Sequence, residues 1–262
     1  MQANSGKNDP RRRVLRVLRE AGDWVSGEAL ADDMGISRAA IGKHVAQLRR
    51  EGNLIQSSTR KGFLLRAEAE PIEPPLVAAS LTTAFLGRMR WLSLGETTST
   101  NTEAAELALD GAEAGTVVTA EVQSRGKGRR GHAWYSTPRG LQFSVVLRPA
   151  GKGADSRSLT GKAQRALIGA LKALAPVAPV AKPPNDLLVN GRKIAGILVE
   201  TGLRGDEVDW LVLGVGCNVN AAPEEFPPGI AAAVTSVLAE SGAVISRNRL
   251  LAEFFNLLEQ SL

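Results

Sequence analysis

A glycine-rich, basic loop between two apolar runs is the feature that most constrains this chain. Residues 124–131 have the sequence SRGKGRRG and lie between runs of strand-forming residues at 116–123 and 142–148. Glycine permits positive φ and a close approach of the backbone to a ligand, while arginine and lysine are donors suited to phosphate or carboxylate. No Gly-Lys-Ser/Thr sequence follows to open a helix, so this is not a Walker motif. The pattern of residues 124–131, here called the glycine loop, predicts an anion-binding loop; a mobile solvated turn is the alternative.

Two further stretches supply the context of the glycine loop. Residues 182–200, KPPNDLLVNGRKIAGILVE, predict strand, turn and strand, with Asn190-Gly191 as a two-residue hairpin turn. Residues 214–220 end another apolar strand. Ser99-Thr100-Asn101 precedes a helix predicted over 102–109, which places hydroxyls and an amide at a helix N-terminus. That arrangement suits a neutral urea or an anion, and simple N-capping is the alternative.

The positive charge of the chain is concentrated in its first quarter. Residues 1–66 hold 13 Lys/Arg and 7 Asp/Glu, whereas residues 67–262 hold 19 and 20. A strong local excess of one charge is typical of a module that meets a charged partner. The asymmetry therefore predicts a nucleic-acid-binding module joined to a nearly neutral body.

Helix signals in this first quarter fit a winged helix-turn-helix. A helix is predicted over 11–21, a second from the N-cap Ser26 to Met34, and a third over 38–51. The short connection through Gly35 and two apolar runs at 54–56 and 62–65 complete the pattern, the runs forming a hairpin wing. The alternative is a three-helix protein-interaction module with a solvated basic face.

On the third helix, the polar and apolar residues fall on different faces. Ile41, Val45 and Leu48 are expected to pack inward. The residues expected to face DNA are Ser37, Arg38, Lys43 and His44.

A proline- and glutamate-rich segment at 67–75 is predicted to be a linker. The chain would then consist of a DNA-binding domain over 1–66, this linker, and a larger domain over 76–262. In the larger domain, an amphipathic helix is predicted over 158–174 and a last helix over 249–262. Further strands are predicted at 90–94, 177–182, 185–189, 192–201 and 210–216. The fold class is therefore α+β.

Taken in order, these motifs resemble the biotin protein ligases, in particular the bacterial kind that also represses the biotin operon. The resemblance runs from about residue 11 to the C-terminus. It implies a winged helix-turn-helix joined to a mixed α/β catalytic domain like that of class II synthetases. It also implies synthesis of biotinyl-AMP from biotin and ATP, with magnesium, and transfer of biotin to the biotin carboxyl carrier protein of acetyl-CoA carboxylase. A homodimer loaded with biotinyl-AMP would bind operator DNA.

The same resemblance assigns roles to individual residues. Lys182 and Arg129 would be catalytic, Lys182 by contacting the carboxylate and the α-phosphate. Asp186 and Lys193 lie in motifs that act on metal or phosphate, and no resident metal ligand is predicted. The biotin-binding positions would be Ser99, Thr100, Asn101, Gln123, Gly126, Lys127, Gly128, Arg129 and Lys182. The nucleotide-binding positions would be Arg129, Arg130, Lys193 and Asn218.

The sequence also departs from the family pattern. Lys127 replaces an arginine, Pro183 replaces a tryptophan, and Gly42 stands where the repressors carry a bulky aromatic residue. The chain stops at Leu262, where the family continues into a small β domain. We therefore expect a complete biotin pocket within residues 76–220, with weak ATP affinity and slow transfer to the acceptor.

The composition indicates the cellular compartment of the protein, and two alternative functions remain. No apolar run approaches the length of a membrane span, and the N-terminus lacks a signal-peptide core. A single cysteine fits the cytoplasm, and with only two histidines it argues against a structural zinc site. One rival is a biotin-binding regulator with weak or lost ligase activity. The other is a ligase for a related acid such as lipoate.

Overall fold

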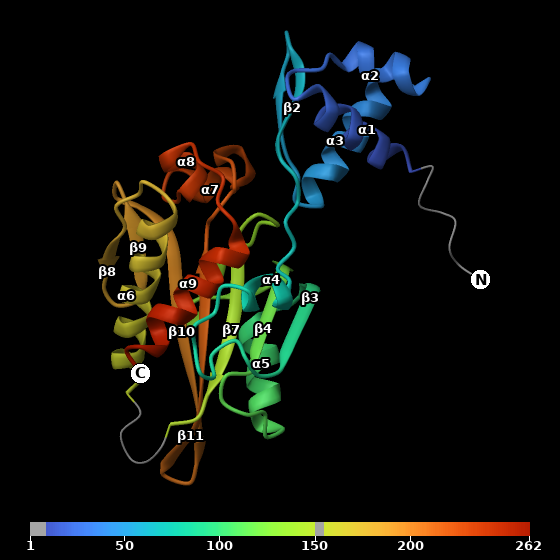
Figure 1. Ribbon diagram of the computed structural model, residues 1–262. Helices are drawn as coiled ribbons and strands as arrows, with labels where there is room; N and C mark the ends of the chain where they lie inside the picture. The colour runs from blue at the N-terminus through green and yellow to red at the C-terminus, as the bar shows by residue number, and fades with distance from the viewer. Residues whose placement is uncertain (1–8, 150–154) are drawn as a thin grey trace, which may run out of the picture. The chain divides into compact units, whose positions relative to one another are not determined.

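The computed structural model describes residues 9–149 and 155–262. The chain divides into two compact units between Glu70 and Pro71 (Figure 1). Each unit has its own hydrophobic core.

The first unit contains the predicted winged helix-turn-helix. Ser26 and Ser37 accept hydrogen bonds from backbone N–H groups three residues ahead, and so begin the second and third helices. Gly35 ends the second helix with a positive φ of 66°. The elements are α1 (Pro10–Ala21), α2 (Gly27–Met34), α3 (Arg38–Arg50), β1 (Leu54–Ser58) and β2 (Gly62–Ala67).

The core of this unit confirms the predicted inward face of α3. Ile41, Val45 and Leu48 are buried, and they pack with Val14 and Leu18 of α1. The strands β1 and β2 pair antiparallel as the wing. An isolated bridge from Val25 to Phe63 ties the wing to the segment before α2.

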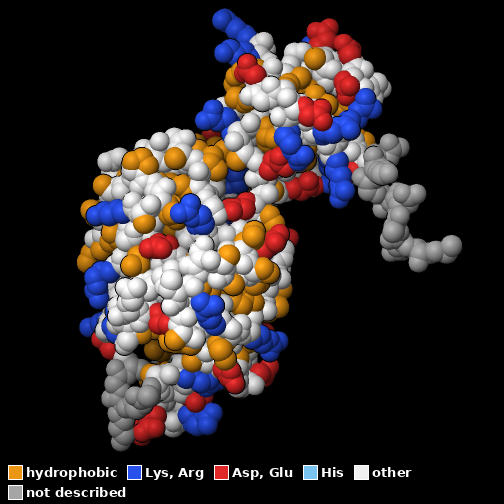
Figure 2. All heavy atoms as spheres, viewed as in Figure 1, with side chains coloured by type: hydrophobic (Ala, Val, Ile, Leu, Met, Phe, Trp, Pro, Cys, Tyr) orange, Lys and Arg blue, Asp and Glu red, His pale blue; other side chains and the backbone are white. Residues whose placement is uncertain are grey.

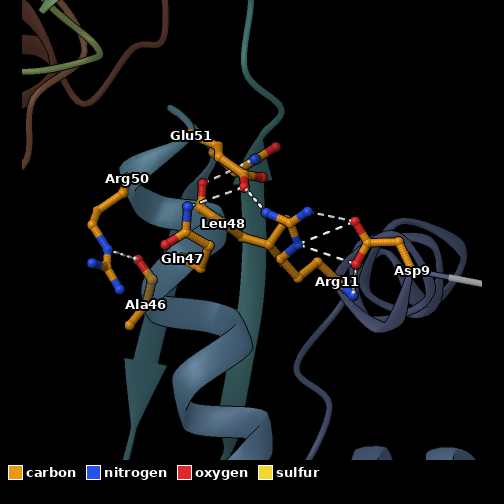
Figure 3. Close-up of polar contacts among 8 residues, drawn as sticks. Asp9, Arg11, Ala46, Gln47, Leu48, Arg50 and Glu51 are labelled. Carbon is orange, nitrogen blue, oxygen red and sulfur yellow. Dashed lines mark hydrogen bonds and ion pairs between the residues drawn. The ribbon is translucent and has the colours of Figure 1, made fainter. Parts of the chain in front are cut away.

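Arg11 links the first turn of α1 to the last turn of α3 (Figure 3). Its guanidinium donates hydrogen bonds to Asp9, with Nε 3.1 Å from each carboxylate oxygen, and to Glu51. Hydrogen bonds from the side chain and then the backbone of Arg11 hold the pKa of Asp9 below its ordinary value. A lowered carboxylate pKa means that this contact stabilises the fold at neutral pH and is lost as acid protonates Asp9.

The second unit is built on a mixed seven-stranded sheet of order β3-β4-β7-β11-β10-β9-β8. Within the described residues, β3 and β4 run parallel and every other pair of neighbouring strands in this sheet is antiparallel. This confirms the predicted mixed α/β architecture. The strands are β3 (Trp91–Thr97), β4 (Val117–Gln123), β7 (Leu141–Leu147), β8 (Val180–Lys182), β9 (Asp186–Val189), β10 (Arg192–Arg204) and β11 (Glu207–Cys217).

The two faces of the sheet have different coverings. Helices α6 (Ser156–Leu174) and α9 (Arg247–Glu259) cover one face (Figure 1). There Phe143 of β7 contacts the rings of Phe254 and Phe255, with centroids 5.2 and 5.5 Å apart. Helix α5 (Thr100–Leu109) covers the other face and packs on alternate residues of β4, β7 and β11. The period-2 alternation of each strand separates these two cores.

Glycines on the α5 face make room for the candidate site. A Cβ at Gly214 would fall on Asn101 Oδ1, and one at Gly216 would lie 2.8 Å from Trp134 Cδ2. Gly216 is paired across the sheet with Gly196 of β10. The glycines therefore allow Asn101 and Trp134 to pack directly on the strands, and both of these side chains line the pocket described below.

Several elements differ from the sequence prediction. Helix α4 (Pro74–Ala78) begins inside the predicted linker, and β8 is shorter than the predicted strand at 177–182. Proline is accepted in the first turn of a helix, which explains the early start of α4. Elements that were not predicted are β5 (Gly126–Lys127), β6 (Ala133–Trp134), α7 (Pro228–Ala231), α8 (Val237–Ser241) and the 3-10 turns at Arg129–Gly131 and Pro223–Glu225.

Candidate functional site

A pocket of about 330 Å³, here called the first cavity, opens on the α5 face of the sheet. The start of α5, the glycine loop and strands β10 and β11 surround it. Its lining brings together the predicted residues Ser99, Thr100, Asn101, Gln123, Lys127, Gly128, Arg129 and Lys193.

Gln123 and Thr100 form the polar floor of the first cavity. The Thr100 backbone N–H and hydroxyl both lie within hydrogen-bonding distance of Gln123 Oε1, at 2.7 and 3.1 Å. Ser144 Oγ lies 2.8 Å from Thr100 Oγ1. Because its oxygen is engaged, Gln123 presents its amide nitrogen as a donor to a ligand. Ser99 is 2% exposed, and within the described residues its side chain makes no capping bond to α5. Its hydroxyl is the second group available to a ligand.

Asn101 lines the first cavity, but its side chain is held by the protein at both ends. Its Oδ1 accepts a hydrogen bond of 2.7 Å from Ser144, and its Nδ2 donates one of 2.8 Å to Glu200. The residue is only 4% exposed. Both polar atoms of the Asn101 side chain are therefore engaged within the protein, and its biotin contact stays a prediction.

The glycine loop folds back on itself as a small hairpin. Strands β5 and β6 pair antiparallel, and Gly128 N–H donates to His132 O at 2.7 Å. A Cβ at Gly126 would lie 2.6 Å from Trp134 O, so this glycine is required by the close approach of the two arms. Arg130 adopts a positive φ of 56°. In the part of the chain that the structure describes, Arg130 lines neither the first cavity nor the second cavity described next.

A second cavity, of about 870 Å³, adjoins the first. The two cavities share Gln123, Ala133, Trp134, Asp186 and Lys193 in their linings. Lys193 Nζ lies 2.7 Å from Asp186 Oδ1 and 5.6 Å from the centroid of the Trp134 ring. A cation held between a carboxylate and an aromatic face thus stands at the boundary of the two cavities.

Comparisons with known proteins agree with this geometry. Residues 94–218 match the Biotin/lipoate A/B protein ligase family, and residues 10–64 match an HTH domain. The chain is 33% identical to the bifunctional ligase/repressor BirA of Bacillus spizizenii over 90% of its own length and 73% of that protein. The chain belongs to the bifunctional biotin ligase/repressor family. It is also 33% identical to BirA of Escherichia coli, over 91% of this chain and 72% of that one.

Solved structures of biotin ligases share the fold. A biotin protein ligase from Aquifex aeolicus, in complex with biotin and ATP, is 27% identical and superposes with a TM-score of 0.58. The match covers 66% of this chain and 69% of the Aquifex chain. The larger unit is therefore the catalytic domain of a ligase, and the predicted fold is confirmed.

Within this ligase, the two lysines of the 182–193 segment lie in different surroundings. Lys182 ends the edge strand β8, is exposed, and lines only the second cavity. The lining of the first cavity includes Ser99 and Thr100 but not Lys182, and the biotin contact predicted for Lys182 stays a prediction. Lys193 borders both cavities. Asn218 lines the second cavity and is buried, with Nδ2 donating to Thr235 O at 2.9 Å.

The residues present fit a magnesium ion carried by ATP better than a resident metal. Among the described residues, no group of three or more His, Cys, Asp or Glu side chains is placed to hold an ion. Asp186 is the carboxylate at the cavity boundary, and one of its oxygens is taken by Lys193. Its other oxygen is available to an ion bound to phosphates.

Cys217 can be excluded as a nucleophile of this ligase. It is fully buried at the end of β11, and burial raises the pKa of its thiol to about 12. Because only the thiolate is nucleophilic, the sulfur is inert at neutral pH.

The helix-turn-helix domain exposes the residues predicted to meet DNA. Arg38 and Lys43 are exposed on α3, His44 is half-buried, and Ser37 caps the helix through Ala40 N–H at 3.2 Å. In the wing, Lys61 Nζ lies 5.9 Å from the ring centroid of Trp24. Figure 2 shows Lys and Arg side chains of this unit interspersed with Asp and Glu. In residues 9–149 and 155–262, no helix is long and apolar enough to cross a membrane.

Replacing Gly62 with alanine is expected to destabilise the helix-turn-helix domain by about 1–3 kcal/mol. Gly62 has a φ of 96°, and a Cβ there would lie 2.6 Å from Ser26 Cα. The bridge from Val25 to Phe63 would open. Hydrogen exchange of the α1–α3 peptides measures this loss.

Gly42→Ala is the matched control for the Gly62 substitution. Nothing lies within 4 Å of a Cβ at Gly42, which is inside α3. Alanine there should stabilise the domain by about 0.5–1 kcal/mol, because glycine is a poor helix former. Unchanged protection in Gly62→Ala would contradict the argument from close packing.

Proposed function

We propose that the protein makes biotinyl-AMP from biotin and ATP and transfers biotin to a lysine of the biotin carboxyl carrier protein. The observation that carries this proposal is the pair of adjoining cavities with Lys193 at their boundary. The first cavity has the size and neutral polar floor for biotin, and the second has room for a nucleotide. A biotin--[acetyl-CoA-carboxylase] ligase of Paracoccus denitrificans, 38% identical over 60% of this chain and 67% of that one, supports the choice of acceptor.

The reaction needs positioned charges more than an enzyme nucleophile. The biotin carboxylate attacks the α-phosphate of ATP, a P–O bond breaks, and pyrophosphate leaves. The acceptor amine then attacks the mixed anhydride and AMP leaves. Catalysis rests on holding the reactants together and on neutralising charge where it develops.

Residues of both cavities would divide these tasks. Gln123 Nε2 and the Ser99 hydroxyl would orient the neutral head of biotin in the first cavity. Lys193 would stabilise the negative charge that develops between the carboxylate and the α-phosphate. Arg129 and the rest of the glycine loop would exclude water from the anhydride. Magnesium would neutralise phosphate charge beside Asp186.

The helix-turn-helix domain would make this ligase a biotin-responsive repressor. We propose that the protein loaded with biotinyl-AMP forms a homodimer with two-fold symmetry and binds a palindromic operator through α3. The exposed Arg38 and Lys43 support this assignment. Sedimentation with and without biotinyl-AMP measures the dimer, and an unchanged mass would contradict it.

Pyrophosphate exchange into ATP tests the catalytic proposal. We expect exchange that depends on biotin and is absent with lipoate. Exchange with lipoate but not biotin would show a ligase for the related acid. Biotin binding in calorimetry without any exchange would instead show a regulator that has lost its catalytic activity. Labelling of a purified carrier protein then measures the transfer step.

A further inference from the structure

Glu200 joins two parts of the first cavity that are far apart in sequence. It lies on β10, on the same face of the sheet as Gly196. One carboxylate oxygen, Oε2, accepts a hydrogen bond of 2.8 Å from Asn101 at the start of α5. The other, Oε1, lies 3.4 Å from Nζ of Lys127 in the glycine loop. A single carboxylate thus connects the floor of the cavity with the loop above it.

The Asn101 end of this connection is fixed. Asn101 is 4% exposed, and its Oδ1 accepts a hydrogen bond from Ser144 while its Nδ2 donates to Glu200. It fits where it does because Gly214, directly beneath it, has no side chain. A carboxylate that is hydrogen-bonded to this fixed amide has little conformational freedom. Glu200 therefore holds its other oxygen, Oε1, in a defined position facing the glycine loop.

The Lys127 end of this connection is more exposed to solvent. Within the described residues, Lys127 is the one side chain of the glycine loop that forms an ion pair. The side chains of Lys127 and Glu200 are 44% and 32% exposed, so water screens their attraction. A pair of this kind shifts an equilibrium by a few-fold rather than by orders of magnitude.

We propose that Glu200 is a positioning residue that holds the glycine loop over the first cavity through Lys127. This rests on the proposed binding of biotin in that cavity. With the loop held in place, less ordering is needed when biotin binds, so the ion pair lowers the KM for biotin without acting on the chemical step.

A double-mutant cycle of Glu200→Gln, Lys127→Gln and their combination tests the proposal. Glutamine at 200 keeps an acceptor for Asn101 but removes the charge that meets Lys127. Arg125, Arg129 and Arg130 are cleavage sites for an arginine-specific protease, which does not cut at position 127 in the parent or in any variant, so the rate of this cleavage without ligand reports how firmly the loop is held. The KM and kcat for biotin in pyrophosphate exchange are the second readout. Glu106→Gln, on the exposed side of α5, is the matched control.

Glu200→Gln should raise both the cleavage rate and the KM for biotin about threefold to fivefold, with kcat within about twofold of the parent. The double variant should resemble either single variant, because both remove the same ion pair. The differences should shrink in high salt. Unchanged cleavage in Glu200→Gln, or additive effects in the double variant, would overturn the proposal. If the parent shows no biotin-dependent exchange, the proposed function fails, yet the cleavage readout still decides the role of Glu200.

Discussion

Lys193→Met is expected to lower the rate of adenylate formation by about 100- to 1,000-fold, the usual cost of removing one charge-stabilising group from a closed site. Lys193 Nζ lies at the boundary of the two cavities, 2.7 Å from Asp186. In the proposed reaction, the carboxylate of biotin and the α-phosphate of ATP meet at that boundary. Methionine keeps the length of the side chain without its charge, so the lost interaction is electrostatic. Single-turnover formation of biotinyl-AMP is the measurement.

Lys182→Met is the matched control, because the sequence predicted Lys182 as the catalytic lysine. It lies exposed at the end of β8 and lines only the second cavity. We expect a much smaller loss of adenylate formation from this substitution, and equal thermal stability in both variants. Activity of Lys193→Met within tenfold of the parent would contradict the assignment. A larger effect at Lys182 would instead support the catalytic role that was predicted for Lys182.

The elements that sequence predicted best carry their own local signals. Ser37 and Gly35 delimit the turn between α2 and α3, and both have the predicted capping roles. Asn190 and Gly191 each adopt a positive φ, as a two-residue hairpin turn requires. Capping and turn chemistry act over a few residues, so they can be recognised without knowledge of the tertiary fold.

The candidate site was predicted less completely because it depends on sheet register. Lys193 reaches Asp186 across the hairpin because Asp186 is paired with Gly196, where a Cβ would lie 3.2 Å from Lys193 Nζ. The turn at 190–191 by itself would place Asp186 opposite Ala195, and a register shift between Lys193 and Ala195 moves Asp186 to Gly196. No local signal in the sequence marks that shift. No local pattern in the sequence predicts the contacts of Glu200 either. Its partners lie 99 and 73 residues away, and only the folded sheet brings them together.

Arg247→Met should destabilise the catalytic domain by about 1–3 kcal/mol, because acceptors of the buried guanidinium would be left unsatisfied. Arg247 is 3% exposed at the start of α9. Its Nη1 donates to the carbonyl oxygens of Pro138 and Gly140, at 3.0 and 2.9 Å, and its Nη2 lies 2.8 Å from Glu121 Oε2. The same Glu121 accepts the backbone N–H of Ile72 at 3.0 Å.

The effect should spread along both strands that this arginine connects. Glu121 is two residues before Gln123 in β4, and Gly140 directly precedes β7. Without the guanidinium, the buried carbonyl of Gly140 and the partly buried carbonyl of Pro138 lose this donor, and Glu121 loses its charged partner. Such unsatisfied groups are costly. Urea unfolding followed by the fluorescence of Trp91, Trp134 and Trp210 measures the change.

Arg249→Met is the control for this experiment. Arg249 is exposed and lies two residues after Arg247 on the same helix, and its loss should change stability by no more than about 0.5 kcal/mol. If both variants unfold at the same urea concentration as the parent, the contacts of Arg247 with Pro138 and Gly140 do not contribute measurably to the stability of the domain. If Arg247→Met alone unfolds early, and also raises the KM for biotin, the buried arginine supports the first cavity from beneath through Glu121 and β4.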